Sequence, residues 1–247
     1  MRPESGSDFS FPGPVAAVYE VVQDHVKYPL RYRNQPDMSK GRYPQGEVLT
    51  ASICHASFND PSREVGKEIY MSIALSAQDI SRALTRISHE ILERNQGSSN
   101  IVLLGIPTRG AHLAARISSI ISGIEGVDIS SGTLDITLFR DDLRLRPPRP
   151  IMPTKIPPAG IEDRDVILID DVLYSGRTIR SALDALGEIG RPRTVQLAAL
   201  VDRGHRQLPI KADFVGKNLP TSISQSVKVL LSEIDGRDEV SIEEEAQ

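Results

Sequence analysis

The sequence predicts an α/β domain in which helices cover a parallel β-sheet. Short apolar runs, typical of buried parallel strands, alternate with amphipathic segments of about a dozen residues. The chain has 247 residues and 39% hydrophobic content, which is enough for one substantial core. The regular alternation starts near residue 76 and continues to about residue 200.

The first predicted helix begins at Ser76. Ser76 and Asp79 have the spacing of a capping box, in which each side chain meets the other residue's backbone. Gly97 is expected to end the helix. The apolar residues of this segment recur at helical spacing and are expected to face the core: Ile80, Leu84, Ile87 and Ile91.

The later elements alternate between strand and helix patterns. Strands are predicted at 101–106, 133–139, 166–169 and 195–201. Helices are predicted at 111–123 and 178–190. A proline-rich segment without periodicity, residues 142–160, is predicted to be a long loop.

The first 70 residues differ in composition from the rest. They are polar and interrupted by Pro, Gly and Ser, and residues 15–26 are the one candidate helix or strand among them. We therefore expect an N-terminal extension at 1–70, mostly disordered, followed by a single domain at 71–247. A small independent module at 1–70 is the alternative.

Composition excludes several classes of protein. The net charge is -4, so bulk charge does not indicate a nucleic-acid binder, although a local basic surface would be hidden in that sum. The one cysteine, Cys54, permits no internal disulfide, and no Cys/His cluster suggests a metal site. Without an apolar run of membrane-spanning length or a signal-peptide pattern, the expectation is a cytoplasmic protein with no membrane partner.

The strongest motif is the stretch VILIDDVLYSGRT at 166–178. An apolar strand runs into Asp170 and Asp171, and a turn at Ser175–Thr178 then opens a helix. Ligands of parallel sheets bind beyond the carboxyl ends of the strands, and a helix N-terminus favours an anion. The turn therefore suits a phosphate, and the two acids suit ribose hydroxyls. The alternative is an ordinary strand-to-helix turn with solvated acids.

This stretch resembles the 5-phosphoribosyl-1-diphosphate (PRPP) signature of the type I phosphoribosyltransferases. The resemblance implies an α/β fold with a parallel-sheet core flanked by helices, a small hood and a mobile loop. It implies contacts to PRPP or a nucleotide from Asp170, Asp171, Val172, Leu173, Tyr174, Ser175, Gly176, Arg177 and Thr178. The Arg177 side chain is expected to point away from the phosphate.

Two further segments fit the same site. The stretch GIPTRG at 105–110 follows a predicted strand, and Thr108 and Arg109 are expected to bind the leaving diphosphate. Arg140 precedes the loop that stands in the place of the family's mobile catalytic loop. The expected catalytic residues are Asp170, Asp171, Arg109 and Arg140. Asp141 and Asp142 are either site residues or solvated loop acids.

Longer blocks resemble the PyrR family, whose members regulate pyrimidine operons and are also uracil phosphoribosyltransferases. These blocks include LTRISHEILERN at 84–95 and VDRGHRQLPIKADFVGKNLPTS at 201–222. The resemblance implies that uracil and PRPP give UMP and diphosphate, with Mg²⁺ carried by PRPP and no metal site in the protein. It also implies a base site under a hood at 202–222 and a homodimer or higher homo-oligomer.

The family also binds the leader mRNA of the pyrimidine operon through a basic surface, and uridine nucleotides strengthen that binding. The matching residues here are Thr85, Arg86, His89, Arg94, His205, Arg206, Lys211 and Lys217. The alternative for the helical members is a solvated basic face. Three other functions stay open: an enzyme for uracil salvage only, a nucleotide-sensing regulator only, and a transferase for purines or orotate. The sequence does not distinguish control by transcription attenuation from control of translation.

Overall fold

The computed structural model describes residues 31–32, 49–52, 68–141 and 152–245. The elements in chain order are β1 (Arg31–Tyr32), β2 (Leu49–Ser52), β3 (Glu68–Leu75), α1 (Ala77–Asn95), β4 (Ile101–Gly105), α2 (Arg109–Glu125), β5 (Ser131–Thr133), η2 (Thr137–Phe139), β6 (Asp165–Leu173), α3 (Arg177–Ile189), β7 (Thr194–Asp202), β8 (Phe214–Asn218), β9 (Gln225–Leu230), α4 (Ser232–Asp235) and β10 (Glu239–Glu245). Two compact units divide the chain, Met1–Tyr70 with Glu245–Gln247 and Met71–Glu244.

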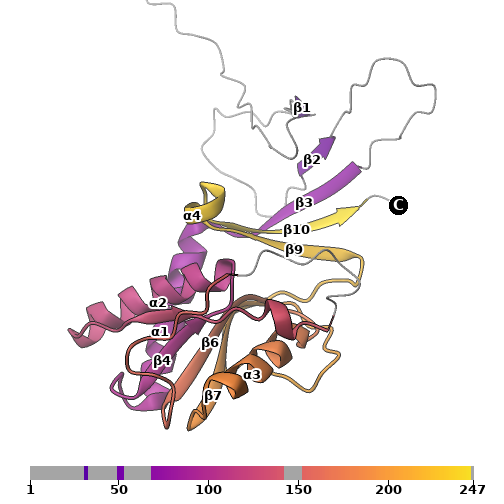
Figure 1. Cartoon of the computed structure of the whole chain (residues 1–247). Coiled ribbons are helices and arrows are strands. Elements are labelled where there is room, and N and C mark those ends of the chain that lie inside the picture. Colours follow the sequence, from indigo (N-terminus) through magenta and orange to yellow (C-terminus); the bar gives the residue numbers. More distant parts are fainter. Residues whose placement is uncertain (1–30, 33–48, 53–67, 142–151, 246–247) are drawn as a thin grey trace, which may run out of the picture. The chain divides into compact units, whose positions relative to one another are not determined.

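A five-stranded parallel sheet forms the centre of the second unit, in the order β5-β4-β6-β7-β8 (Figure 1). The strands are in register across its middle, so that Leu104 lies opposite Leu168 and Leu168 opposite Leu197. Both faces of β6 are covered by other elements, which explains its continuous apolar run.

Alternate residues of these strands supply two separate apolar cores. Leu103 and Ile167 face α1 and α2, and they belong to one cluster with residues of those helices. Leu104 and Leu168 face the opposite side and cluster with residues of α3. This alternation follows from the two-residue period of a strand and confirms the predicted arrangement of a sheet covered on both sides.

A smaller antiparallel group contains β9 and β10, with β3 as the neighbour of β10. Its buried residues Val229, Leu231 and Val240 join the same cluster as α1 and α2. In the first unit, β1 pairs antiparallel with β2. The helices that the structure describes include none long and apolar enough to cross a membrane.

The structure confirms the predicted start of α1 and corrects the strand predicted at 133–139. Ser76 and Asp79 form the full capping box, with Asp79 N donating to Ser76 Oγ at 3.3 Å. Strand β5 ends at Thr133, and Thr137–Phe139 is a short 3-10 helix. The reason is the Asp135 side chain, whose Oδ1 accepts bonds from Thr137 N at 3.0 Å and Thr137 Oγ1 at 2.7 Å.

The segment predicted to form the hood also differs in part. Residues 214–218 are β8, which pairs with β7 at the edge of the parallel sheet, and Phe214 is buried in the core. The predicted helix or strand at 15–26 and most of the predicted loop at 142–160 lie outside the described residues.

An arginine clamp fastens the turn at 231–238 to α2. Arg116 donates hydrogen bonds to both oxygens of Glu233, to both oxygens of Asp238 and to the Ser232 hydroxyl, at 2.6–2.9 Å. Hydrogen bonds from Arg116 lower the pKa of the Glu233 and Asp238 carboxyls, and the same bonds raise the pKa of Arg116. The clamp therefore needs both carboxyls ionised.

These lowered pKa values predict a loss of stability in acid. A carboxyl whose pKa is lowered by folding stabilises the protein above its ordinary value of about 4, and that contribution disappears as the pH falls through the folded value. We expect the free energy of unfolding to fall as the pH drops below about 5. Asp238→Asn should lower it at pH 7 by about 1–3 kcal/mol and should weaken this pH dependence.

Urea denaturation of both proteins at several pH values measures these quantities. The control is Asp184→Asn, because Asp184 pairs only loosely with Arg180 on the exposed side of α3, at 3.8 Å. An exposed pair of this kind contributes about 0–1 kcal/mol. Equal effects of the two substitutions would contradict the role given to the clamp.

Candidate active site

Strand β6 carries two carboxylates to the carboxyl edge of the central sheet. Asp170 is buried, with 6% of its surface exposed, and Asp171 is half-buried. The Asp170 carboxylate accepts a hydrogen bond from Asp171 N at 3.0 Å, and the Asp171 carboxylate accepts one from Val172 N at 3.0 Å. These local bonds help to fix the orientation of both acids at the edge of the sheet.

The chain then turns through Ser175 and Gly176 into helix α3. Gly176 is the N-cap residue, has a φ of 90°, and lies so close to Ile210 that an added Cβ would come within 3.3 Å of it. Glycine suits both constraints, and a glycine N-cap has no side-chain oxygen to occupy the free N–H groups of the helix. Arg177 N donates to Ser175 Oγ at 3.4 Å, and the other N–H groups of the first turn of α3 can donate to an anion.

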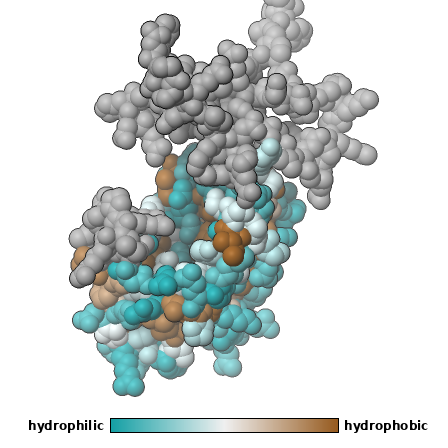
Figure 2. Space-filling view, turned by 90° about the vertical axis from the view of Figure 1, so that its right-hand side faces the viewer, coloured by the Kyte–Doolittle hydropathy of each residue, from teal (hydrophilic) through white to brown (hydrophobic). Residues whose placement is uncertain are grey.

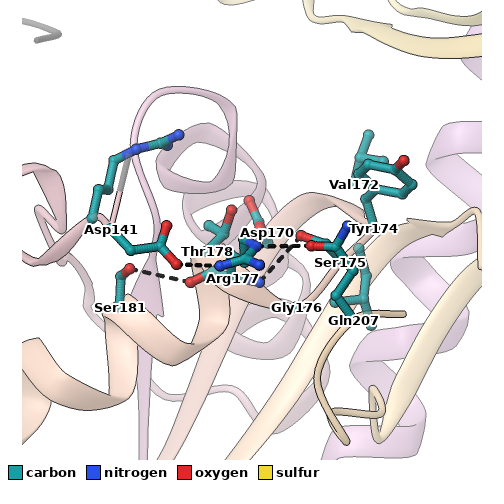
Figure 3. Close-up of a pocket in the computed structure, with 12 residues that line it drawn as sticks. Asp141, Asp170, Val172, Tyr174, Ser175, Gly176, Arg177, Thr178, Ser181 and Gln207 are labelled. Atoms are coloured by element: carbon teal, nitrogen blue, oxygen red, sulfur yellow. Dashed lines mark hydrogen bonds and ion pairs between the residues drawn. The ribbon is translucent and has the colours of Figure 1, made fainter. Parts of the chain in front are cut away.

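A cavity of about 300 Å³ opens at this turn (Figure 3). Its lining brings most of the motif together in one place. It includes Asp170 and the whole of 172–178, together with Arg140, Asp141, Ser181 and Gln207.

The Arg177 side chain is held by two partners. It lines this cavity, donates from Nε to Gln207 Oε1 at 2.8 Å, and pairs with Asp141. In Figure 3 the guanidinium lies between these two partners. Arg177 therefore links the loop that follows β7 to the segment after η2, and its orientation away from a bound phosphate stays a prediction.

A second cavity, of about 390 Å³, adjoins the first. The two share Arg140, Asp170, Val172 and Thr178 in their linings. The remaining lining residues of the second are Ile106, Pro107, Thr108, Arg109, Asp135, Ile136, Thr137, Met152 and Asp171. All four predicted catalytic residues thus lie around one continuous hollow.

The loop between β4 and α2 is held against the end of β6. Ile106 N donates to Ile169 O at 2.9 Å, and the peptide bond from Pro107 to Thr108 is cis. Gly110 approaches β6 so closely that a Cβ there would lie 2.4 Å from Ile169 O. Only a glycine permits this distance, so Gly110 sets the position of Thr108 and Arg109 beside the two acids.

Sequence reasoning missed several residues of the hollow. Asp135 and Thr137 come from the segment predicted as a strand, and Gln207 comes from the predicted hood. An Asp two residues before a Thr is a recognisable turn signal, and it could have identified Asp135 and Thr137 from the sequence. Gln207 carries no such signal. It reaches the turn at Ser175–Thr178, here called the phosphate turn after its predicted ligand, only through the tertiary fold.

Comparison with protein families matches residues 73–232 to the phosphoribosyl transferase domain. The protein named "Bifunctional protein PyrR" from Streptomyces coelicolor is 61% identical over 166 residues, which cover 67% of this chain and 86% of that protein. Its namesake from Mycolicibacterium paratuberculosis is 58% identical over 172 residues, which cover 68% of this chain and 90% of that protein.

The chain belongs to the PyrR family of phosphoribosyl transferases. Solved structures agree on the fold. A hypoxanthine phosphoribosyltransferase from Staphylococcus aureus matches with a TM-score of 0.51 at 20% identity, over 68% of this chain and 90% of that one. One from Trypanosoma cruzi matches with a TM-score of 0.52 at 15% identity, over 68% of this chain and 89% of that one. The predicted type I phosphoribosyltransferase fold is thereby confirmed.

The PyrR-like basic residues of α1 lie exposed beside β8. Arg86 donates to the carbonyl oxygens of Val215 at 3.0 Å and Gly216 at 2.7 Å, and Arg94 pairs with Asp213 at 2.8 Å. The other members on these elements are exposed as well: Thr85, His89 and Lys217. Arg86 and Arg94 therefore contribute to packing as well as to the charge of this surface.

The two predicted RNA-binding residues of the 203–208 segment differ from one another. His205 is exposed, donates from Nε2 to Thr221 O at 2.6 Å, and meets the Tyr174 ring edge-on at 6.1 Å between ring centroids. Arg206 is half-buried, pairs with Asp202, and donates to the carbonyl oxygens of Tyr174 at 2.7 Å and Ile210 at 2.9 Å. The Arg206 guanidinium thus faces the phosphate turn, and Lys211 is exposed.

Because Gly110 lies so close to β6, adding one methyl group at this position should destabilise the protein. Gly110→Ala should lower the free energy of unfolding by about 1–3 kcal/mol, because the added Cβ overlaps the Ile169 carbonyl. The matched control is Gly123→Ala in the same helix, where a Cβ meets nothing within 4 Å. The free energy of unfolding of the Gly123→Ala protein should rise by up to about 1 kcal/mol, because alanine has the higher helix propensity. Thermal or urea denaturation measures both, and a neutral Gly110→Ala would contradict the close approach.

Proposed function

We propose that the chain converts uracil and PRPP to UMP and diphosphate. The observation that carries this proposal is the order of groups along β6 and α3: two carboxylates, a tight turn, and a helix N-terminus, all around one hollow. The positive end of a helix suits the 5-phosphate, and carboxylates suit the ribose hydroxyls. PyrR membership supports uracil as the base.

The proposed reaction is a displacement at C1 of the ribose. The bond from C1 to the diphosphate oxygen breaks and the leaving group takes the electron pair. Uracil N1 bonds to C1 and gives up its proton to water. The sugar gains positive charge on the way, which the carboxylates of Asp170 and Asp171 stabilise electrostatically. The rest of the rate comes from holding the two substrates in line.

The diphosphate is assigned to Thr108, Arg109 and Arg140, which line the second cavity. Mg²⁺ is proposed to arrive with PRPP. Oxygen ligands suit this cation, and Asp170 and Asp171 supply carboxylate oxygens beside the diphosphate subsite. The residues that the structure describes contain no group of three or more His, Cys, Asp or Glu side chains arranged to hold a metal ion. When bound, Mg²⁺ would neutralise charge on the leaving group.

The second proposed activity is binding of the pyrimidine-operon leader mRNA by the predicted residues that lie exposed: Thr85, Arg86, His89, Arg94, His205, Lys211 and Lys217. Phosphate neutralisation would supply affinity and unpaired bases specificity. The proposal includes the expected homodimer or higher homo-oligomer, a cytoplasmic location, and an N-terminal extension at 1–70 beside the enzyme domain at 71–247. Support comes from PyrR membership and from the exposure of these side chains despite the net negative charge.

Replacing Asp171 tests the enzymatic proposal. Asp171→Asn should lower kcat/KM for UMP synthesis roughly 100-fold, because the neutral amide no longer stabilises the charge on the sugar. Arg177→Ala should lower it by about tenfold or less, since the guanidinium bonds Gln207 and Asp141. The assay follows UMP from uracil and PRPP, with orotate and hypoxanthine as competing bases. Preference for either other base would refute the assignment to uracil.

Replacing Lys217 tests the RNA proposal without disturbing the bonds between α1 and β8. In a gel-shift titration with the leader RNA, Lys217→Ala should weaken binding and reduce the salt slope by about 1. The control is Lys228→Ala, because Lys228 is an exposed lysine of β9 outside the predicted set and pairs with Glu243 at 3.5 Å. UMP synthesis should be unchanged in both variants. Equal loss of RNA binding in the two variants would contradict a localised surface.

A further inference from the structure

Helix α2 meets the turn at 231–238 through two arginines that are used in different ways. Arg116 donates hydrogen bonds to Glu233, Asp238 and Ser232, as described above. Arg109, at the first position of the same helix, meets only Asp235 in this turn. The first contact fastens the turn, and the second reaches the wall of the cavity assigned to diphosphate.

The contact between Arg109 and Asp235 uses one nitrogen of the guanidinium. Nη2 lies 3.1 Å from Asp235 Oδ1 and 3.0 Å from Oδ2. Nε is buried and has no hydrogen-bond partner among the residues that the structure describes. Arg109 as a whole lines the second cavity, and Asp235 uses only part of its hydrogen-bonding capacity.

Asp235 is held from the other side. Its Oδ2 accepts a hydrogen bond from Leu231 N at 2.9 Å. The carboxylate therefore has a fixed position. An arginine has five N–H donors in a rigid plane, so one edge can stay on Asp235 while the rest binds an anion.

We propose that Asp235 is a positioning residue for the diphosphate of PRPP, acting through Arg109. It orients the guanidinium so that the donors not used by Asp235 serve an oxygen of the diphosphate in the cavity with Thr108. This inference rests on the proposed function, because it assumes that the cavity takes PRPP. Asp235 lies 126 residues from Arg109 in the chain, and no sequence motif connects the two.

The experiment measures diphosphate binding directly and PRPP turnover separately. Calorimetric titration with Mg²⁺ and inorganic diphosphate should give a Kd about tenfold higher for Asp235→Asn than for the unchanged chain. The KM for PRPP should rise by a similar factor, while kcat changes by less than about threefold. An unchanged or lower Kd would overturn the proposal, since a lower value would mean that Asp235 competes with diphosphate for Arg109.

Two further variants separate positioning from a structural role. Asp238→Asn lies in the same turn but contacts Arg116, so it should lower stability and leave the diphosphate Kd within about twofold. Arg109→Ala removes the group through which Asp235 acts. In that background Asp235→Asn should weaken diphosphate binding no further, and a full additional tenfold loss would overturn the proposal.

The outcomes also distinguish this inference from the proposed function. If the unchanged chain makes no UMP but Asp235→Asn still weakens diphosphate binding, the assignment to uracil fails and the role of Asp235 stands. If the chain makes UMP and Asp235→Asn binds diphosphate normally, the role of Asp235 fails alone. Thermal denaturation before each titration establishes that the variants are folded. Arg109→Lys, which keeps the charge but lacks the planar guanidinium, should also raise the Kd for diphosphate.

Discussion

The position of β6 in the middle of the sheet is the constraint on which the rest of the structure depends. Its residues from Val166 to Ile169 are buried on both faces, so the strand tolerates no shift of register. The register fixes where the apolar run ends, and that point is where Asp170 and Asp171 emerge at the edge of the sheet. The phosphate turn, the approach of Gly110 and the second cavity are all arranged around this one end.

Three arginines hold the surrounding loops in place through hydrogen bonds and ion pairs. Arg116 fastens the turn at 231–238, Arg206 donates to the carbonyl oxygens of Leu173 and Tyr174, and Arg177 links Gln207 to Asp141. Each of these guanidiniums meets acceptors from segments distant in the sequence, which suits the several donors of an arginine. A basic residue near the site is therefore not by itself a ligand for substrate or RNA, and its partners in the fold decide its role.

The two proposed activities meet in the segment from Arg203 to Leu208. The N–H groups of Gln207 and Leu208 both donate to Ser175 O in the phosphate turn, at 3.0 and 3.1 Å. Arg203 packs over the Tyr174 ring at 4.2 Å, and His205 touches the edge of that ring while remaining exposed. One short stretch of chain thus contacts the predicted nucleotide site and carries a predicted RNA-binding side chain.

Figure 2 shows that the visible described surface is largely hydrophilic, with small separate hydrophobic patches.

The sequence by itself determined the parallel sheet, the cap of α1, and the acids and turn of the phosphate motif. Those features depend on local periodicity and on residues adjacent in the chain, which a single sequence displays directly. It misplaced residues 133–139 as a strand, because alternation there suggested a sheet while the Asp135 side chain bonds Thr137 and favours a turn. Only the tertiary structure decided that Phe214–Asn218 closes the edge of the main sheet, that Arg206 faces inward, and that Asp235 meets Arg109. Those outcomes depend on which distant segments pack together, and no local pattern encodes that choice.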